Sequence, residues 1–401
     1  MQLVDKKKCT ACGACASICP KSALKIKADD EGFYYPINDN KLCIECGACA
    51  RVCPIINNNY STLKYSNIDS YVLRHKDKSV LKESTSGGAF TAIVQLFLKD
   101  ESFYAIYGAA EQKNLSVKHI RIDNIRDLNL IRKSKYVESY SGIIFRTVKK
   151  DILDGRKVIY SGTPCQIAGL RSYLQKDYNN LLTIEIVCHG VPTTLLLNKY
   201  IQYQEKKYHG KCEHIEYRSK KNSNWLNPKI RLEFNNQKIF ERKSYASDDA
   251  YMIGFCKFLC LRENCSECLY ASPERVADFT IADFWGIEES GIKMEYGDGV
   301  SLILANSNKA KKIIPDINNV AEITEINYDF AMKHNQQLVS PAKADPRRTD
   351  FLHDLKNASF KELRKKYLKP RNIMERMLSN LLSRKSKAVI KRFLGLKPTE
   401  Y

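Results

Sequence analysis

The middle of the chain alternates short apolar runs with amphipathic segments. Between about 68 and 340 the apolar runs have the length of strands, and the segments between them place apolar residues at helical spacing. This alternation predicts an α/β or α+β core. The clearest examples are expected strands at 103–109, 157–160 and 182–187, and expected helices at 87–98 and 166–174.

A stretch from 217 to 240 has a different pattern, in which every second residue is apolar. Two such runs, 229–234 and 237–242, flank Asn235 and Asn236, residues that favour a tight turn. An antiparallel hairpin is therefore expected. We predict a mixed sheet for the core, which spans 68–345, and not a purely parallel one.

Beyond Pro346 the pattern becomes helical, with apolar residues spaced among many Lys and Arg and a break at Pro370. This predicts a basic amphipathic helical tail over 346–401. Such a segment meets a membrane surface, a partner helix or solvent, so peripheral membrane contact is one expectation. The tail has no aromatic interleaving and no recognised binding module, which argues against a nucleic-acid partner even though the formal net charge is +20.

The first 56 residues contain an internal repeat of cysteines. Each copy has three cysteines spaced by two residues, then a fourth followed by proline, and a polar linker at 57–67 comes after the second copy. This spacing is typical of a bacterial ferredoxin with two [4Fe-4S] clusters, in which the fourth cysteine of each run ligates the other cluster. We assign one cluster to Cys9, Cys12, Cys15 and Cys53, and the second to Cys43, Cys46, Cys49 and Cys19.

Zinc sites and a purely structural cluster are the alternatives to an electron-carrying pair. Zinc is commonly held by two separated CxxC pairs, and twin sets of three cysteines plus one do not match that arrangement. Lys6, Lys7 and Lys8 lead directly into Cys9 without an apolar segment, so we expect no signal peptide and a reducing cytoplasm. No run is long and apolar enough for a membrane span.

Several short motifs stand at expected strand ends or helix starts within the core. Ser84 to Gly88 precede a helix, where backbone amides favour an anion, although serine and glycine are also ordinary helix-start residues. Four cysteines occur in the motifs Ser161-Gly-Thr-Pro-Cys165-Gln, Cys188-His-Gly-Val-Pro and Cys265-Ser-Glu-Cys268.

Together with Arg132 and Lys135, these motifs make residues 68–310 resemble the beta subunit family of coenzyme F420 hydrogenases and dehydrogenases, in a bacterial form with a fused ferredoxin domain. The resemblance implies FAD and a third [4Fe-4S] cluster. The implied cluster ligands are Cys165, Cys188, Cys265 and Cys268. The implied flavin contacts are Ser84, Ser86, Gly87 and Gly88 for the pyrophosphate, with Arg132 and Lys135 for phosphate or ring.

Some assignments stay open at the level of sequence. Cys256 or Cys260 could replace one ligand of the third cluster, and Cys165 and Cys188 could be small buried residues. His189 is a candidate proton donor, but a structural imidazole explains it equally well. The catalytic residues are otherwise unspecified.

We expect an iron-sulfur flavoprotein oxidoreductase with an α+β fold, which accepts electrons from a donor such as reduced ferredoxin and reduces an organic acceptor. Clusters carry single electrons and a flavin combines them into pairs. The alternative is an electron-transfer subunit without its own substrate, docked on a catalytic partner. Family members with this fusion are often encoded beside cell-surface polysaccharide genes. The resemblance therefore implies a role in cell-surface polysaccharide metabolism and a location close to the membrane.

Overall fold

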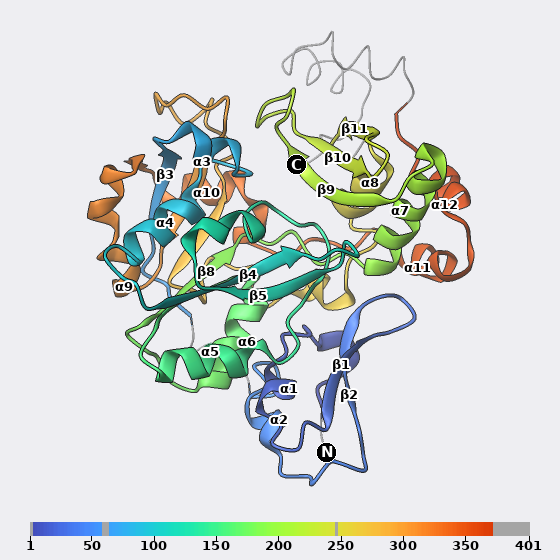
Figure 1. The fold of residues 1–401 in the computed structure, drawn as a ribbon, viewed down its shortest axis with the longest axis horizontal. Coiled ribbons are helices and arrows are strands. Elements are labelled where there is room, and N and C mark those ends of the chain that lie inside the picture. Colours follow the sequence, from blue (N-terminus) through green and yellow to red (C-terminus); the bar gives the residue numbers. More distant parts are fainter. Residues whose placement is uncertain (1–2, 58–63, 245–247, 372–401) are drawn as a thin grey trace.

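The computed structural model describes residues 3–57, 64–244 and 248–371 (Figure 1). Its centre is a nine-stranded sheet in the order β14-β3-β13-β12-β8-β7-β4-β5-β6. The four central strands β12, β8, β7 and β4 are parallel, whereas β13, β3, β14 and β5 add antiparallel pairs on either side. The strands are β3 Asp69–His75, β4 Tyr104–Glu111, β5 Val117–Ile122, β6 Ser139–Tyr140, β7 Lys157–Gly162, β8 Leu181–Ile186, β12 Phe279–Asp283, β13 Ser301–Ala305 and β14 Ala321–Glu325.

Helices cover both faces of this sheet because its central strands are apolar on both sides. Ile106 and Ile159 face α4 (Ala89–Phe97), while the next residues, Tyr107 and Tyr160, face the opposite layer. That layer contains α5 and α6, which lie side by side in Figure 1. The bounds of these two helices are Ile144–Leu153 and Pro164–Leu174. The expected strands and helices of the core are therefore confirmed, and so is the mixed sheet.

The cysteine repeat folds as a small unit beneath α5 and α6 (Figure 1). An antiparallel strand pair, β1 and β2, lies beside two short helices, α1 and α2, and α1 packs directly against α5 and α6. The elements of this unit are η1 Lys6–Lys8, α1 Ala14–Ile18, β1 Leu24–Ala28, β2 Tyr34–Asn38 and α2 Ala48–Arg51.

The expected hairpin forms, but it lies outside the main sheet. It belongs to a separate three-stranded sheet, β11-β10-β9, so the mixed character of the main sheet has another source. The reason is packing: Ile230 and Leu232 on β10 bury their side chains against α7 and α8, in a second core. The bounds are α7 Thr194–Tyr208, β9 Cys212–Ser219, β10 Lys229–Phe234, β11 Ile239–Lys243 and α8 Ala250–Cys256.

The first part of the expected tail packs into that second core. Helices α11 (Arg348–Asn357) and α12 (Phe360–Lys366) contact α7, and Phe351 and Leu363 are almost fully buried. Both helices are therefore integral to the fold as far as Arg371. The rest of the expected tail, 372–401, lies outside the described residues.

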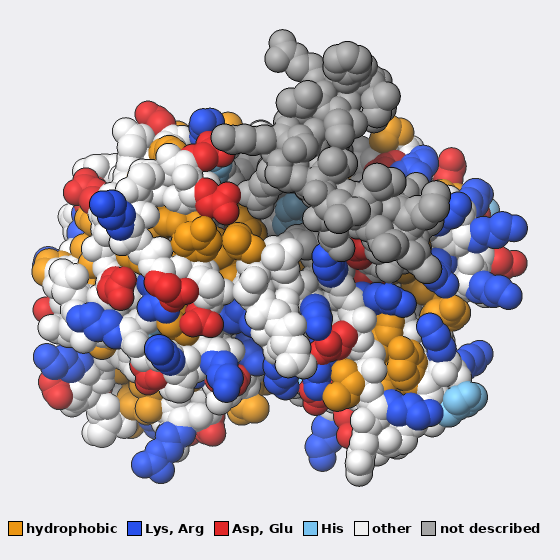
Figure 2. Space-filling view, turned by 90° about the horizontal axis from the view of Figure 1, so that it is seen from above, with side chains coloured by type: hydrophobic (Ala, Val, Ile, Leu, Met, Phe, Trp, Pro, Cys, Tyr) orange, Lys and Arg blue, Asp and Glu red, His pale blue; other side chains and the backbone are white. Residues whose placement is uncertain are grey.

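The remaining elements are short and connect the layers: α3 Lys78–Lys82, η3 Ile125–Leu130, η4 Glu263–Glu267, α9 Asn308–Lys311, η5 Ile314–Asn319, α10 Tyr328–His334 and η6 Gln336–Leu338. Among the helices that the structure describes, none has the length and apolar character to cross a membrane. Charged side chains of both signs are interspersed on the face shown in Figure 2.

Candidate iron-sulfur and flavin sites

The first eight cysteines line two hollows in the small N-terminal unit. One hollow is lined by Cys19 together with Cys43, Cys46 and Cys49, which is the grouping assigned to the second cluster. Cys46 is exposed, as are Leu42 and Ile44 beside it. We call this the outer cluster site, because its rim meets solvent.

The other hollow is lined by Cys9, Cys12, Cys15 and Cys53, with Cys49 in the shared wall. Burial raises the pKa of the Cys12 thiol to about 12, and the proximity of Cys53 and Cys9 contributes to the same shift. These four cysteines form the inner cluster site, on the side that faces the core. Each hollow is lined by three cysteines of one run and the fourth cysteine of the other run, as the assignment requires. The ligand assignment itself stays a prediction.

Two glycines shape the loops that carry these cysteines. Gly13 and Gly47 begin α1 and α2 in the left-handed region, with φ of +88° and +69°. A Cβ on Gly13 would lie 2.8 Å from the carbonyl oxygen of Gly142. Glycine at 13 therefore allows the inner cluster loop to approach the core closely.

The four core cysteines come from three places that the fold brings together. Cys165 lies in the first turn of α6, directly after β7, and Cys188 follows the neighbouring parallel strand β8. The carboxyl ends of parallel strands meet at one edge of a sheet, which explains this convergence. Cys265 and Cys268 approach from η4, and the amide of Val191, close to Cys188, lies 3.4 Å from the Cys265 sulfur.

Each of the other three thiols influences the ionisation of Cys165, which agrees with the convergence of the four. Burial raises the pKa of Cys165, and Cys188, Cys268 and Cys265 each raise it further. Four buried thiols cannot all ionise together without a cation, so iron would be needed to hold them as thiolates. The set therefore fits a cluster, and we call it the core site. Among the described residues, no three His, Cys, Asp or Glu side chains are arranged to hold a single metal ion. A [4Fe-4S] cluster does not need that arrangement, because each of its cysteine ligands binds a different iron.

The two open alternatives, Cys256 and Cys260, belong to the apolar core around α7 and α8, against which Cys265 also packs. Cys260 is fully buried in the apolar core around α7 and α8, and its carbonyl accepts a hydrogen bond from the Thr193 amide. The cysteine that couples to Cys260 is Cys256, and neither appears among the charges that shift the four core-site thiols. The mutual influence among the thiols thus favours Cys165, Cys188, Cys265 and Cys268 as the set.

The inner cluster site and the core site are adjacent. A Cβ on Gly169 would lie 2.6 Å from the Cys12 Cβ and 2.7 Å from its sulfur, so Cys12 rests directly on α6. Cys165 is four residues earlier in the same helix, about 6 Å along its axis. Tyr270 lies between the two sites: burial raises its pKa, and Cys165 and Cys12 contribute in that order.

Two side chains at this junction were absent from the sequence interpretation. One is Tyr270, two residues after Cys268, and the other is Arg262, three residues before Cys265. Arg262 is buried and forms an ion pair with Glu138. Their only signal in the sequence is proximity to the CxxC pair, and neither the approach of the N-terminal unit nor the position of Glu138 can be read from spacing.

The expected phosphate loop packs tightly against the sheet. The Ser84 and Ser86 hydroxyls donate to the carbonyls of Val80 and Val300, and the Gly87 amide donates to the Ser301 hydroxyl. A Cβ on Gly87 would lie 2.4 Å from the Leu73 carbonyl oxygen. Packing thus explains glycine at 87 without a ligand.

The start of α4 nevertheless retains features of an anion site. Gly88, with φ of +86°, begins the helix and no side chain caps its first amides. Arg132 reaches α4 through its hydrogen bond to the Thr91 hydroxyl. Lys135 donates to the carbonyls of Arg132 and Lys133, and burial lowers its pKa to about 7. These features fit a pyrophosphate, and the flavin contacts stay a prediction.

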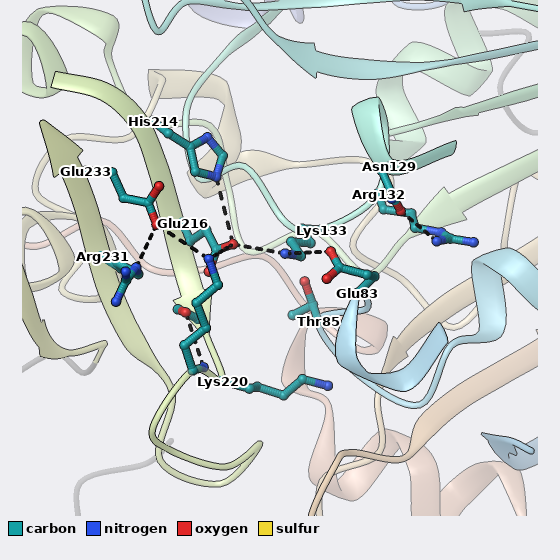
Figure 3. A network of polar contacts seen from close by, with 12 residues as sticks. Glu83, Thr85, Asn129, Arg132, Lys133, His214, Glu216, Lys220, Arg231 and Glu233 are labelled. Carbon is teal, nitrogen blue, oxygen red and sulfur yellow. Dashed lines mark hydrogen bonds and ion pairs between the residues drawn. The ribbon is translucent and has the colours of Figure 1, made fainter. Parts of the chain in front are cut away.

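The network in Figure 3 also shows which cations are already paired. Lys133 bridges Glu83 and Glu216, at 3.1 and 2.9 Å. Arg132 donates to the side chains of Thr91 and Asn129, while the Lys135 ammonium donates to the carbonyl of Arg132. Within the described residues, Arg132 and Lys135 are therefore the cations of this loop that form no ion pair with a carboxylate.

His189 packs between aromatic rings and away from the polar network. Its ring centroid lies 4.6 Å from that of Phe258 and 5.1 Å from that of Phe255, and burial lowers its pKa to about 4. A neutral imidazole held by aromatic rings matches the structural interpretation of this residue. Its role as a proton donor stays untested.

Comparison with known proteins relates both parts of the chain to iron-sulfur proteins. Residues 8–56 match the model of a 4Fe-4S dicluster domain. Residues 155–329 match the model for the C terminus of the coenzyme F420 hydrogenase/dehydrogenase beta subunit. The resemblance expected from the motifs is confirmed, and the N-terminal unit carries two [4Fe-4S] clusters.

The match to the beta subunit family includes all four core-site cysteines but not Ser84 to Gly88, Arg132 or Lys135. No curated protein matches the chain. A chain from the F420-reducing [NiFe] hydrogenase complex of Methanosarcina barkeri is similar at 16% identity, with a TM-score of 0.43 over 75% of this chain and 91% of that chain.

Proposed function

We propose that this protein is an iron-sulfur flavin-dependent oxidoreductase that takes single electrons from a ferredoxin-type donor and reduces an organic acceptor. The observation that carries the proposal is the contact between Cys12 and Gly169, which places the inner cluster site one helical turn from Cys165. A dicluster unit that only stabilised the fold would not need to bring its ligand to this position.

The arrangement of the cysteines gives the relay a direction. The outer cluster site has the exposed Cys46, with Leu42 and Ile44 exposed by 45% and 57% beside it. Exposed apolar side chains next to a cluster suit transient docking of a protein donor. The inner cluster site is more buried, and the core site is reached through it. We therefore place electron entry at the outer cluster.

Residues at the core site would hold the third cluster with little rearrangement. Thr163 begins α6 with a capping box to Gln166, which fixes the turn that presents Cys165. The buried ion pair between Arg275 and Glu185 positions the segment after Cys268, because the Arg275 guanidinium also donates to the Tyr270 carbonyl. The capping box and the ion pair would both orient cysteine ligands without binding the cluster themselves.

A bound flavin would supply the conversion between single electrons and a pair. The chain's contribution would be to hold its phosphates at the uncapped start of α4 and beside Lys135. Because burial leaves Lys135 only partly protonated near neutral pH, an anion there would favour its charged form.

Anaerobic purification with iron, sulfide and flavin assays tests the proposal. We expect about twelve irons, from three cubanes, and one flavin per chain. Acceptors, including nucleotide-activated sugars, would then be screened with reduced ferredoxin as donor. A preparation with about eight irons and no flavin after reconstitution would contradict the proposal and favour an electron-transfer subunit that lacks its own substrate.

A further inference from the structure

Arg262 occupies a position between the inner cluster site and the core site. It lies three residues before Cys265 and directly precedes η4, which contacts η1, the short helix just before Cys9. The Cys265 amide donates to the Arg262 carbonyl at 3.1 Å, and Lys7 in η1 forms an ion pair at 3.5 Å with Glu263, the residue after Arg262. Arg262 therefore lies in the backbone segment that leads to Cys265 and next to the segment that leads to Cys9.

One nitrogen of the Arg262 guanidinium, Nη2, has a clear structural role. Its Nη2 donates to the Tyr34 carbonyl at 3.1 Å and to the Glu138 carboxylate, and Glu138 accepts from the Tyr34 amide at 3.1 Å. The ring centroid of Tyr35 lies 4.6 Å from the guanidinium carbon. The pair of Arg262 and Glu138 thus fastens β2 of the N-terminal unit to the core.

The other donors of Arg262 are not explained by this task. Both Nε and Nη1 are buried, and neither has a hydrogen-bond partner among the described residues. An unsatisfied buried donor destabilises the folded state, and more so when the group is charged. Sulfur ligands of an iron-sulfur cluster carry negative charge and accept hydrogen bonds, so they would satisfy donors that protein oxygen does not.

We propose that Arg262 donates hydrogen bonds to cysteine sulfur at the junction, first to Cys9, and raises the reduction potential of the inner cluster. The effect follows from charge, because reduction adds one electron and a neighbouring cation stabilises the more negative state. Glu138 opposes this effect, but its carboxylate accepts from Nη2 and leaves Nε and Nη1 available to sulfur. The inference rests on the assignment of Cys9 to the inner cluster and does not require the flavin.

The test is a potential measured by redox titration with EPR detection, on the full chain with its clusters. The double variant Arg262→Gln/Glu138→Gln removes both charges together, so no unpaired carboxylate stays buried. We expect the equilibrium constant for reducing the inner cluster to fall about tenfold, a downward shift of about 59 mV. Arg262→Lys, which keeps the charge but loses the planar fork, should lie between this variant and the wild type.

Arg74→Gln is the matched control, because Arg74 is another buried arginine in an ion pair, on β3, three strands from β8. It should leave both potentials unchanged. If Arg262 only fastened β2, every variant that keeps its iron would show the wild-type potential, and the proposal would be overturned. Iron content separates this outcome from failure of the proposed function, since loss of the core cluster alone leaves about eight irons.

A measurement on the wild type decides the matter if the Arg262 variants do not assemble. Arginine labelled with ¹⁵N in its guanidinium should show a hyperfine coupling to the reduced inner cluster in pulsed EPR. The Arg74→Gln variant should retain this coupling. A wild-type spectrum without any ¹⁵N coupling would contradict a direct hydrogen bond to cysteine sulfur.

Discussion

Gly169 and Cys12 are in contact across the boundary between the N-terminal unit and the core. A Cβ at Gly169 would lie 2.7 Å from the Cys12 sulfur, closer than packing allows. The absence of a side chain on one residue of α6 is thus what lets a ligand of the inner cluster rest one turn from Cys165. This contact places Cys12 of the N-terminal unit directly against α6 of the core.

Gly169→Ala should therefore weaken the inner cluster, although alanine favours a helix by about 0.5–1 kcal/mol over glycine. Overpacking of this kind typically costs about 1–3 kcal/mol. We expect faster loss of iron from the inner cluster in air, measured by EPR and iron release. Gly297→Ala, whose Cβ would meet only the end of the Glu295 side chain, is the control. Greater stability of the inner cluster in Gly169→Ala would show that the contact is unimportant.

The exchange of fourth cysteines gives a second prediction. Cys19 lines the outer hollow with Cys43, Cys46 and Cys49, although it is nearer in sequence to Cys15. Cys19→Ser should damage the outer cluster and spare the inner one, while Cys53→Ser should do the reverse. EPR of the reduced proteins distinguishes the two. Loss of the inner cluster in Cys19→Ser would reverse our ligand assignment.

Truncation separates the integral part of the C-terminal region from the rest. Ending the chain after Arg347 removes Phe351, Leu355, Phe360 and Leu363, each buried in the second core. At about 1.5–3 kcal/mol each, their loss costs about 6–12 kcal/mol, comparable to the stability of a typical domain. Thermal unfolding should show a large drop in the melting temperature of that variant, or no folded state. A chain ending after Arg371 should keep its stability and cofactors, and cofactor loss there would contradict this division.

The pH dependence of stability has a predicted contribution from His214. Its hydrogen bonds to Glu111, at 2.7 Å, and to Glu216 raise its pKa to about 9. Because the folded-state pKa lies above the unfolded value of about 6.5, this contribution is fully present below pH 6.5 and is lost as pH rises through 9.

His214→Gln should therefore lower the free energy of unfolding at pH 6 and leave it unchanged near pH 10. The side chain is 45% exposed, so solvent screening limits the effect to about 1 kcal/mol or less. Urea unfolding at several pH values measures it. An equal loss at both extremes would show that packing, and not charge, explains the role of His214.

Local patterns predicted the elements of the core well, because strand and helix periodicity depends on neighbouring residues. Helix α6 and strand β7 were expected close to their observed bounds. The placement of the 229–242 hairpin was harder to predict, since an alternating pattern reveals a buried face but not the element that covers it. Here α7 and α8 cover it, and the hairpin leaves the main sheet.

The candidate site shows the same division. The spacing of the N-terminal cysteines is sufficient to predict iron-sulfur clusters from the sequence. Cys165 and Cys188 each follow a predicted strand, and ligands bind at the carboxyl ends of strands. Arg262 and Glu138 meet through the tertiary fold, from segments 124 residues apart. The Ser84 to Gly88 motif was ambiguous because the same residues suit a phosphate loop and the close packing observed against β13.

The rate of flavin reduction in a Cys268→Ser variant tests the central claim most directly, because Cys268 belongs to the core site and lies beyond the N-terminal unit. Stopped-flow absorbance would follow the flavin after mixing with reduced ferredoxin and, separately, with dithionite. If electrons pass through the core site, reduction by ferredoxin slows in the variant and reduction by dithionite stays close to the wild-type rate. Equal slowing with both donors, or wild-type rates with both, would contradict the relay.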